Sequence, residues 1–302
     1  MHAGHLLEAT DCAIELYNAS NTKIDSPVAQ AFTLKGLYLA HIGFPGRAIN
    51  LLRQSLWLRP DDRYTAEGMA LALEDKYAPL PKRVEPGRII IGLGSGRSGS
   101  SSITNLLNSQ KDSHIAHEAP PRMGWSQDHN RLAVHMRRFN ILRQYHGFVG
   151  DVSHWWLPYA EQMLEQDVNI CFVAMQRNKE ATVNSYLKIK GYQGNNKSGA
   201  INHWIEHDGT FFEKNIWDEA YPKFDVDNLP DALSMYWDTY YEECTDLQQR
   251  YPDRFRIFET ERLEDSSYQL DILKFCGFEN PVLEKEVRLN AAGSVEDGAK
   301  LV

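Results

Sequence analysis

The sequence has few cysteines, and their positions do not suggest disulfides or a metal site. Cys12, Cys171, Cys244 and Cys276 lie far apart, without a CxxC pair and without a histidine at metal-ligand spacing. A disulfide framework or a zinc site requires clustered ligands. We therefore predict reduced thiols, as is typical of a cytosolic protein, and no bound metal.

Long apolar runs and excess positive charge are also missing. No stretch approaches the roughly 20 apolar residues that cross a membrane. Residues 1–20 lack the basic region followed by an apolar region that marks a signal peptide. The net charge of −9 at pH 7 disfavours nucleic acids and anionic membranes as partners. We expect a cytoplasmic protein in which a local site holds any bound anion.

Residues 1–80 have the apolar spacing of helices. Pro- and Gly-containing breaks separate the expected helices, which cover 5–18, 28–42, 46–58 and 63–76. Residues 31–60 resemble one tetratricopeptide repeat, and the matching positions are Phe32, Gly36, Leu39, Gly43, Ala48, Leu52, Ser55 and Pro60. A generic helical hairpin is the alternative. Because one repeat cannot bury its own apolar face, these helices are expected to pack on the next domain or on a protein partner.

A different pattern begins after the Pro-rich linker at residues 81–87. Short apolar runs at 88–93, 168–177 and 254–260 read as strands, and each is followed by a helical pattern. Strands that alternate with helices predict a three-layer α/β domain with a central parallel sheet, of the type that carries a phosphate-binding loop. We assign this domain to residues 88–302.

Residues 191–241 are expected to be an irregular insertion in this domain. Its aromatic side chains include Tyr192, Trp204, Phe211, Phe212, Trp217, Tyr221, Phe224, Trp237 and Tyr240. A long insertion in a compact domain is often a lid or a binding pocket. Aromatic packing of an accessory helix pair is an equally good interpretation.

The sequence RIIIGLGSGRSGSSSITNLL, residues 88–107, runs from a strand through a glycine-rich turn into a helix. Such a turn offers backbone N–H groups at a helix N-terminus to an anion. A P-loop NTPase has a lysine that binds the nucleotide phosphates at the position of Ser100, so the loop does not match that class. The spacing of residues 94–99 matches the GxGxxG of dinucleotide dehydrogenases, and Glu118 lies near the ribose-binding offset. That match leaves Arg97 and the neighbouring hydroxyl groups without a role.

The loop resembles the 5′-phosphosulfate loop of sulfotransferases that use 3′-phosphoadenosine 5′-phosphosulfate (PAPS). In that family a basic residue, a Ser, a Gly and two hydroxyl residues precede the helix. The corresponding residues here are Arg97, Ser98, Gly99, Ser100 and Ser101, and Gly96 directly precedes them. The resemblance implies that these residues bind PAPS, and that Arg97 also stabilises charge during sulfuryl transfer.

A second stretch, RNKEATVNSYL, resembles the 3′-phosphate motif of the same family. That motif has an Arg at a strand end and a Ser eight positions later, and Arg177 and Ser185 have this spacing. A guanidinium group suits a phosphate because its planar donors can bind two oxygens. The resemblance covers about 88–278 and implies 3′,5′-adenosine bisphosphate as the released product.

Two residues are candidates for the base that accepts the proton of the attacking group. Glu118 resembles the catalytic Glu of tyrosylprotein sulfotransferases in placement, and His117 is expected to orient it. His154 lies where small-molecule sulfotransferases have a strand ending in Lys-Thr-His. We favour Glu118 as the base. The plain alternatives are that Glu118 is a helix-capping carboxylate and that His154 is a loop residue with satisfied hydrogen bonds.

The sequence departs from the family at two places. The lysine expected before His154 is absent, since Val152 and Ser153 occupy that region, and Arg288 is the one candidate to replace the family's C-terminal Arg-Lys-Gly segment. The primary hypothesis is a PAPS-dependent enzyme that sulfates a small-molecule, glycan or tyrosine acceptor without a metal. A degenerate binding protein, in which the N-terminal helices recruit a partner, and an NAD(P)-dependent oxidoreductase are the alternatives.

Overall fold

The structure, a computed structural model, describes residues 26–192, 203–204 and 217–283. The helix expected at 5–18, the aromatic residues Phe211 and Phe212, and Arg288 lie outside the described residues. Within the described part, no helix is both long enough and apolar enough to cross a membrane.

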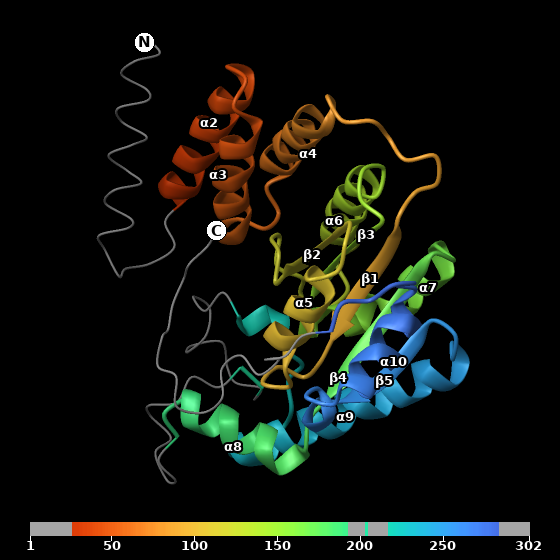
Figure 1. Cartoon of the computed structure of the whole chain (residues 1–302). Coiled ribbons are helices and arrows are strands. Elements are labelled where there is room, and N and C mark those ends of the chain that lie inside the picture. Colours follow the sequence, from red (N-terminus) through yellow and green to blue (C-terminus); the bar gives the residue numbers. More distant parts are fainter. Residues whose placement is uncertain (1–25, 193–202, 205–216, 284–302) are drawn as a thin grey trace.

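A five-stranded parallel sheet forms the centre of the molecule. Its strands are β1 (Arg88–Leu93), β2 (Ser113–His117), β3 (Phe148–Val152), β4 (Ile170–Gln176) and β5 (Phe255–Glu259). They lie in the order β2-β3-β1-β4-β5 (Figure 1). The strands predicted at 88–93, 168–177 and 254–260 are confirmed as β1, β4 and β5. The polar edge strand β2 was not predicted, because only one of its five side chains, that of Ile115, is buried.

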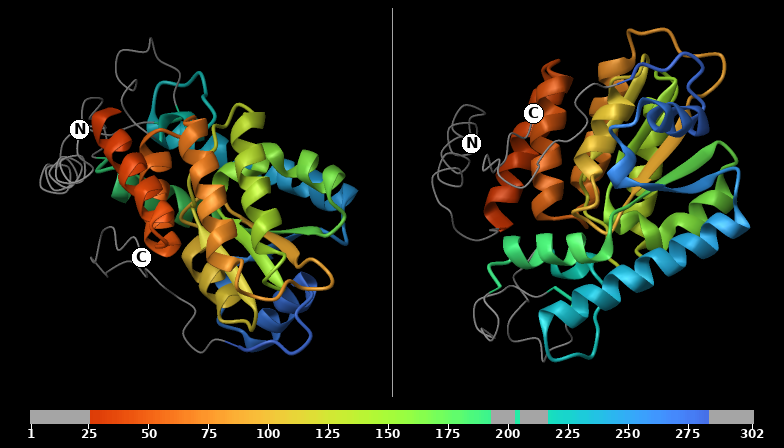
Figure 2. Two further views of the ribbon diagram at one scale, coloured as in Figure 1. Left: turned by 90° about the horizontal axis from the view of Figure 1, so that it is seen from above. Right: turned by 60° about the horizontal axis from the view of Figure 1, so that its bottom comes forward.

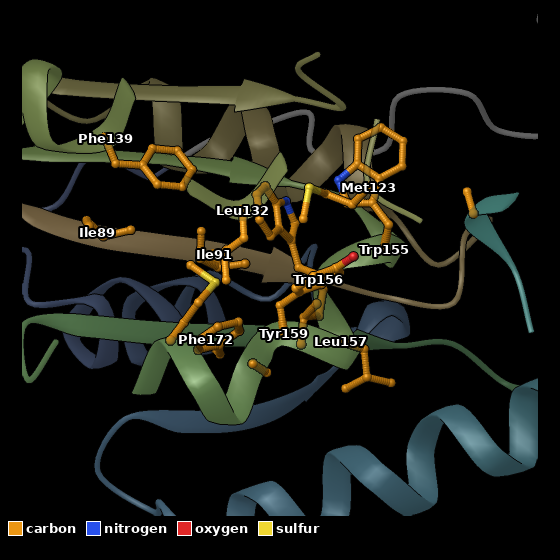
Figure 3. Packing of buried hydrophobic residues seen from close by; sticks show 14 of the residues in the cluster. Ile89, Ile91, Met123, Leu132, Phe139, Trp155, Trp156, Leu157, Tyr159 and Phe172 are labelled. Atoms are coloured by element: carbon orange, nitrogen blue, oxygen red, sulfur yellow. The ribbon is translucent and has the colours of Figure 1, made fainter. Parts of the chain in front are cut away.

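Helices cover both faces of the sheet. The helices α5 (Ser100–Asn108) and α10 (Ser266–Cys276) share a core with Ile90 of β1, whereas α6 (His129–Leu142), α7 (Ala160–Gln166) and α9 (Leu229–Arg250) share one with Ile89 and Ile91. Neighbouring β1 residues serve opposite faces because side chains alternate along a strand. Figure 3 shows the second core, where Phe139, Trp156 and Phe172 pack around β1. The predicted three-layer α/β fold is confirmed.

Three described helices precede the sheet: α2 (Ser26–His41), α3 (Pro45–Leu58) and α4 (Arg63–Tyr77). Their bounds agree with the expected helices to within two residues. Gly36 lets α2 approach α3, since a Cβ there would lie 2.7 Å from the Leu52 Cγ. Helix α4 lies beside α6 (Figure 1), so these helices pack on the α/β domain as expected. The tetratricopeptide assignment remains a prediction.

The linker and the insertion differ in part from expectation. Residues 81–87 contain no helix or strand, but the backbone N–H groups of Arg83 and Gly87 donate to the carbonyl oxygens that follow α6, Gln144 O and Arg143 O. The insertion was expected to be irregular up to residue 241, which is wrong because α9 begins at Leu229. The Asn228 side chain caps this helix at the N–H of Asp231, and a proline in its first turn favours the start. Figure 2 shows α9 as a long helix along the sheet domain.

Candidate functional site

The predicted site residues lie at one edge of the sheet. Since all five strands are parallel, their carboxyl ends meet at the same edge. The loop 94–99 follows β1, Glu118 follows β2, His154 comes two residues after β3, and Arg177 follows β4. Open α/β sheets bind ligands outside the carboxyl ends of their strands. The topology thus places four separate sequence motifs around one location.

The backbone of the loop after β1 needs its glycines. Gly96 and Gly99 have φ values of +79° and +90°, and Arg97 between them has φ of +55°. L-residues with side chains rarely adopt this left-handed region. A Cβ on Gly96 would also lie 1.9 Å from the Tyr186 hydroxyl oxygen. The loop therefore folds back tightly before Gly99, the N-cap residue of α5.

Three tyrosines and one threonine hold this loop. The N–H groups of Gly94 and Ser95 donate to the hydroxyl oxygens of Tyr240 (3.1 Å) and Tyr241 (3.4 Å) on α9. The Tyr186 hydroxyl, on α8 (Lys179–Ile189), donates to the Ser95 carbonyl at 2.7 Å. On the far side, the Thr260 hydroxyl donates to Ser98 O at 2.6 Å. Sequence reasoning gave none of these residues this role, because their partners lie 91 to 162 positions away.

The rest of the loop has unused donors. Within the described part of the chain, the backbone N–H groups of residues 96–101 donate no hydrogen bond, and no side chain caps the start of α5. The Ser98 hydroxyl oxygen is buried near the Tyr241 hydroxyl, and no hydrogen bond of good geometry joins it to any of the described residues. Unpaired donors at a helix N-terminus form a site for an anion, which the helix dipole also favours.

The two predicted phosphate motifs meet at this loop. Arg177 Nη1 donates to the Arg97 carbonyl oxygen at 3.0 Å, across 80 positions of sequence. Arg97 Nε in turn donates to the Ser185 hydroxyl oxygen on α8 at 3.2 Å. The two guanidinium groups and the Ser185 hydroxyl are thus gathered beside the unused N–H groups. This arrangement can bind a ligand with two phosphate-like groups.

Glu118 lies beside the same loop. Burial raises the pKa of its carboxyl group, the nearby Asp151 charge adds to the rise, and His117 opposes it. Burial raises the pKa of Tyr186, the residue that holds Ser95, and the Glu118 charge adds to this rise. His117 Nε2 pairs with the Ser100 hydroxyl at 3.0 Å, and the expected orientation of Glu118 by His117 stays a prediction. A buried carboxylate with a raised pKa can serve as a base near neutral pH.

His154 is in a different environment. It is 4% exposed, its Nε2 lies 3.1 Å from the Ala220 carbonyl oxygen, and its ring stacks on Tyr221 at 4.3 Å between centroids. Since a carbonyl only accepts, Nε2 carries the proton in this pair. Burial lowers the pKa of His154 to about 3. These features match the plain alternative of a buried, satisfied histidine, and they favour Glu118 as the base.

Aromatic rings around His154 form a cluster of Trp57, His154, Trp155, Trp217 and Tyr221. We call it the acceptor side because the function proposed below assigns it to the acceptor. Trp217 stacks on Trp155 at 6.0 Å and meets Trp57 of α3 edge-on at 5.4 Å. A helix of the N-terminal region thus contributes directly to this cluster. That contribution was not predicted, because nothing in the spacing of Trp57 distinguishes it from a core residue.

Charged residues fix the acceptor side to the N-terminal helices. Arg131 of α6 donates to Asp61 (Nε–Oδ1, 2.7 Å; Nη2–Oδ2, 2.8 Å) and to Glu219 (Nη1–Oε1, 2.8 Å). Arg122 adds a bond to the Trp57 carbonyl and another to Glu219 at 3.4 Å. Glu219 belongs to η2 (Asp218–Ala220), which supplies the carbonyl group that binds His154. The short helix η2 is therefore joined to the turn between α3 and α4.

The crystal structure of a sulfotransferase from Alicyclobacillus acidocaldarius is similar to this chain, with a TM-score of 0.41 and 16% sequence identity. The similarity covers 68% of this chain and 87% of that chain. No family model and no curated protein matches the sequence.

Proposed function

We propose that this chain is a sulfotransferase that moves a sulfuryl group from PAPS to the hydroxyl or amine group of an acceptor. The observation that carries the proposal is the contact among Arg97, Arg177 and Ser185 at the loop after β1. The two stretches were each matched to a phosphate motif of PAPS-dependent enzymes on sequence alone. Their contact in space supports one ligand that carries both a 5′-phosphosulfate and a 3′-phosphate.

The residue types suit sulfuryl transfer better than the alternatives. An NTPase loop would carry a lysine at Ser100. A dinucleotide enzyme would not require Arg97 and Arg177 side by side. Fixed N–H donors and a guanidinium group stabilise charge on the equatorial oxygens and on the leaving phosphate. The buried Ser98 hydroxyl, next to Tyr241, suits this role as a further donor.

The proposed reaction balances without a metal or a redox partner. The acceptor oxygen or nitrogen forms a bond to sulfur in line with the breaking bond between sulfur and the 5′-phosphate oxygen. Glu118 takes the acceptor proton, and the electron pair of the broken bond leaves with 3′,5′-adenosine bisphosphate. The aromatic rings of the acceptor side suit a sugar ring, an aryl group or a tyrosine.

Calorimetric titration with 3′,5′-adenosine bisphosphate in the presence of EDTA tests the donor site. We expect binding by the wild type and a loss of about 10- to 100-fold in affinity for both Arg97→Ala and Arg177→Ala, because each removes charge-assisted hydrogen bonds. Arg250→Ala is the matched control, since Arg250 pairs with Glu161 and Asp246 on the surface. No binding to a folded wild type contradicts the proposal, whereas NAD binding that survives Arg177→Ala would favour an oxidoreductase.

An acceptor screen separates an enzyme from a degenerate binding protein. With [³⁵S]PAPS and pools of sugars, phenols and tyrosine peptides, transfer by the wild type and its loss in Glu118→Gln is the expected result. Tight bisphosphate binding without transfer to any acceptor class would favour a protein that keeps the donor site for binding alone.

A further inference from the structure

We propose that Asp151 is a positioning residue for Glu118. Its carboxyl group holds the turn after β2 so that the Glu118 side chain faces the loop 94–99. The role of Glu118 as base rests on the proposed function. The contact between Asp151 and the turn does not, and the experiment below keeps the two apart.

The backbone at Glu118 needs an external restraint. Its φ of +51° lies in the left-handed region, which costs an L-residue about 1–2 kcal/mol. Two hydrogen bonds to β3 flank this residue. The Glu118 N–H donates to Val152 O at 3.1 Å, and the Ala119 N–H donates to Asp151 Oδ1 at 3.0 Å. The first continues the strand pairing, whereas the second is made by a side chain.

Asp151 occupies a position where an apolar residue would be expected. It is fully buried on β3, between β2 and β1, in a strand whose last four residues are all buried. Its second oxygen, Oδ2, accepts from Trp156 Nε1 at 2.8 Å. A carboxyl group in a sheet interior costs free energy unless its oxygens are bonded. Both oxygens of Asp151 are used, one on the Glu118 turn and one on η1 (His154–Tyr159).

Two arginines on the same face of the sheet compensate the Asp151 charge. Arg138 Nη2 of α6 lies 3.9 Å from Asp151 Oδ1. Burial lowers the pKa of Arg138 to about 10 and also lowers the pKa of Arg53, and in both cases attraction to Asp151 opposes the change. The carboxyl group is thus fixed by hydrogen bonds at its oxygens and by cations behind it, which makes it a rigid anchor for Ala119.

The anchor also affects proton binding at Glu118. The charged or titratable groups that face Glu118 are His117 on β2, Asp151 on β3, Tyr186 on α8 and Tyr221 after η2. Burial is the main cause of the raised pKa of Glu118, and Asp151 raises it further by repulsion between like charges. A residue that only stabilised the fold would not change the titration of Glu118 in a defined direction.

Three variants test this inference. Asp151→Asn keeps an oxygen that can accept from Ala119 but removes the charge, and Asp151→Ala removes both. Trp156→Phe is the matched control, because it removes the other hydrogen bond of Asp151 and leaves the Ala119 contact. The carboxyl carbon of Glu118, assigned with Glu118→Gln, is titrated by ¹³C NMR in each folded variant with 3′,5′-adenosine bisphosphate present, and the Ala119 amide is followed by hydrogen exchange.

The expected result is a Glu118 titration midpoint that moves to lower pH in Asp151→Asn and stays in place in Trp156→Phe. The Ala119 amide should exchange slowly in the wild type and in Asp151→Asn, and much faster in Asp151→Ala. Slow exchange of the Ala119 amide in a folded Asp151→Ala variant overturns the inference. If that variant does not fold, rapid Ala119 exchange in the wild type overturns it instead. Failure of the bisphosphate to bind contradicts the proposed function and leaves these measurements on Glu118 and Ala119 valid.

Discussion

The donor side and the acceptor side of the candidate site are built in different ways. The donor side consists of the loop 94–99 and residues 177–185 at the start of α8, and each is one continuous stretch that follows a strand. The acceptor side combines α3, η1 and the residues around η2, which are distant in sequence. The residues proposed for the donor are therefore close in sequence, whereas those proposed for the acceptor are brought together by tertiary packing. Variants on one side should leave the other intact, and that independence can be tested.

The largest effect is expected for Gly96→Ala. Its methyl group would overlap the Tyr186 hydroxyl at a φ that Ala rarely adopts. Strain of about 2–3 kcal/mol in the loop should weaken 3′,5′-adenosine bisphosphate binding by roughly 30- to 150-fold, as calorimetry would show. Gly43→Ala is the control, since Gly43 also has positive φ but has no atom within 4 Å of its would-be Cβ. Equal affinities for wild type and Gly96→Ala would contradict the described loop geometry.

Arg131→Leu should instead affect the acceptor side. Removal of this mostly buried guanidinium group takes away the hydrogen bonds of Asp61 and leaves Glu219 with Arg122 alone, which should cost about 2–3 kcal/mol of unfolding free energy. Urea denaturation measures this loss. Bisphosphate affinity of the folded variant should not change. The control Arg137→Leu breaks an exposed pair with Glu67 and should cost less than about 1 kcal/mol. A large loss of bisphosphate affinity in Arg131→Leu would show that the two sides are coupled.

Trp57→Phe should have a smaller effect of the same kind. The variant reduces the contact area with the Trp217 ring and removes part of the ring that lies beneath Arg122. About 1 kcal/mol of stability should be lost, with a melting temperature lower by roughly 2–4 °C by calorimetry. A stability equal to that of the wild type would place Trp57 outside the acceptor side.

Glu118→Gln should give the smallest effect on stability, with the opposite sign. The folded protein raises the pKa of Glu118, mainly by burial, so the stability that this group contributes is present at low pH and is lost as pH rises through the raised pKa. At pH 7 the Gln variant should therefore be more stable than the wild type. The difference should disappear as the pH falls below the ordinary carboxyl value of about 4.3. Melting temperatures measured between pH 4 and 8 check both the sign and the trend.

The same contrast explains what could be predicted from sequence. Periodicity gave the three described helices before the sheet and three of the strands, and the resemblance to two PAPS-binding motifs gave Arg97, Arg177 and Ser185, which do meet. The signals were local, so one sequence sufficed. Strand β2 was missed because its side chains are partly exposed, and the start of α9 was missed because its aromatic residues were interpreted as an irregular insertion.

The supporting residues of the site could not be predicted. Tyr240, Tyr241 and Thr260 bind loop atoms about 146 to 162 positions away, and their spacing carries no sign of this. Asp151 lies in a stretch whose resemblance directed attention to His154. Hydrogen bonds of this kind depend on which strands are neighbours, and strand order is not written in any short segment of the chain.

The most direct test of the central claim compares two ligands on two proteins. Wild type and Arg177→Ala are titrated with 3′,5′-adenosine bisphosphate and with adenosine 5′-monophosphate, which lacks the 3′-phosphate. The account predicts that the wild type prefers the bisphosphate by at least about tenfold and that Arg177→Ala removes most of this preference, since the guanidinium group binds the 3′-phosphate. Equal affinities of the wild type for the two ligands, or a preference that Arg177→Ala leaves unchanged, would contradict it.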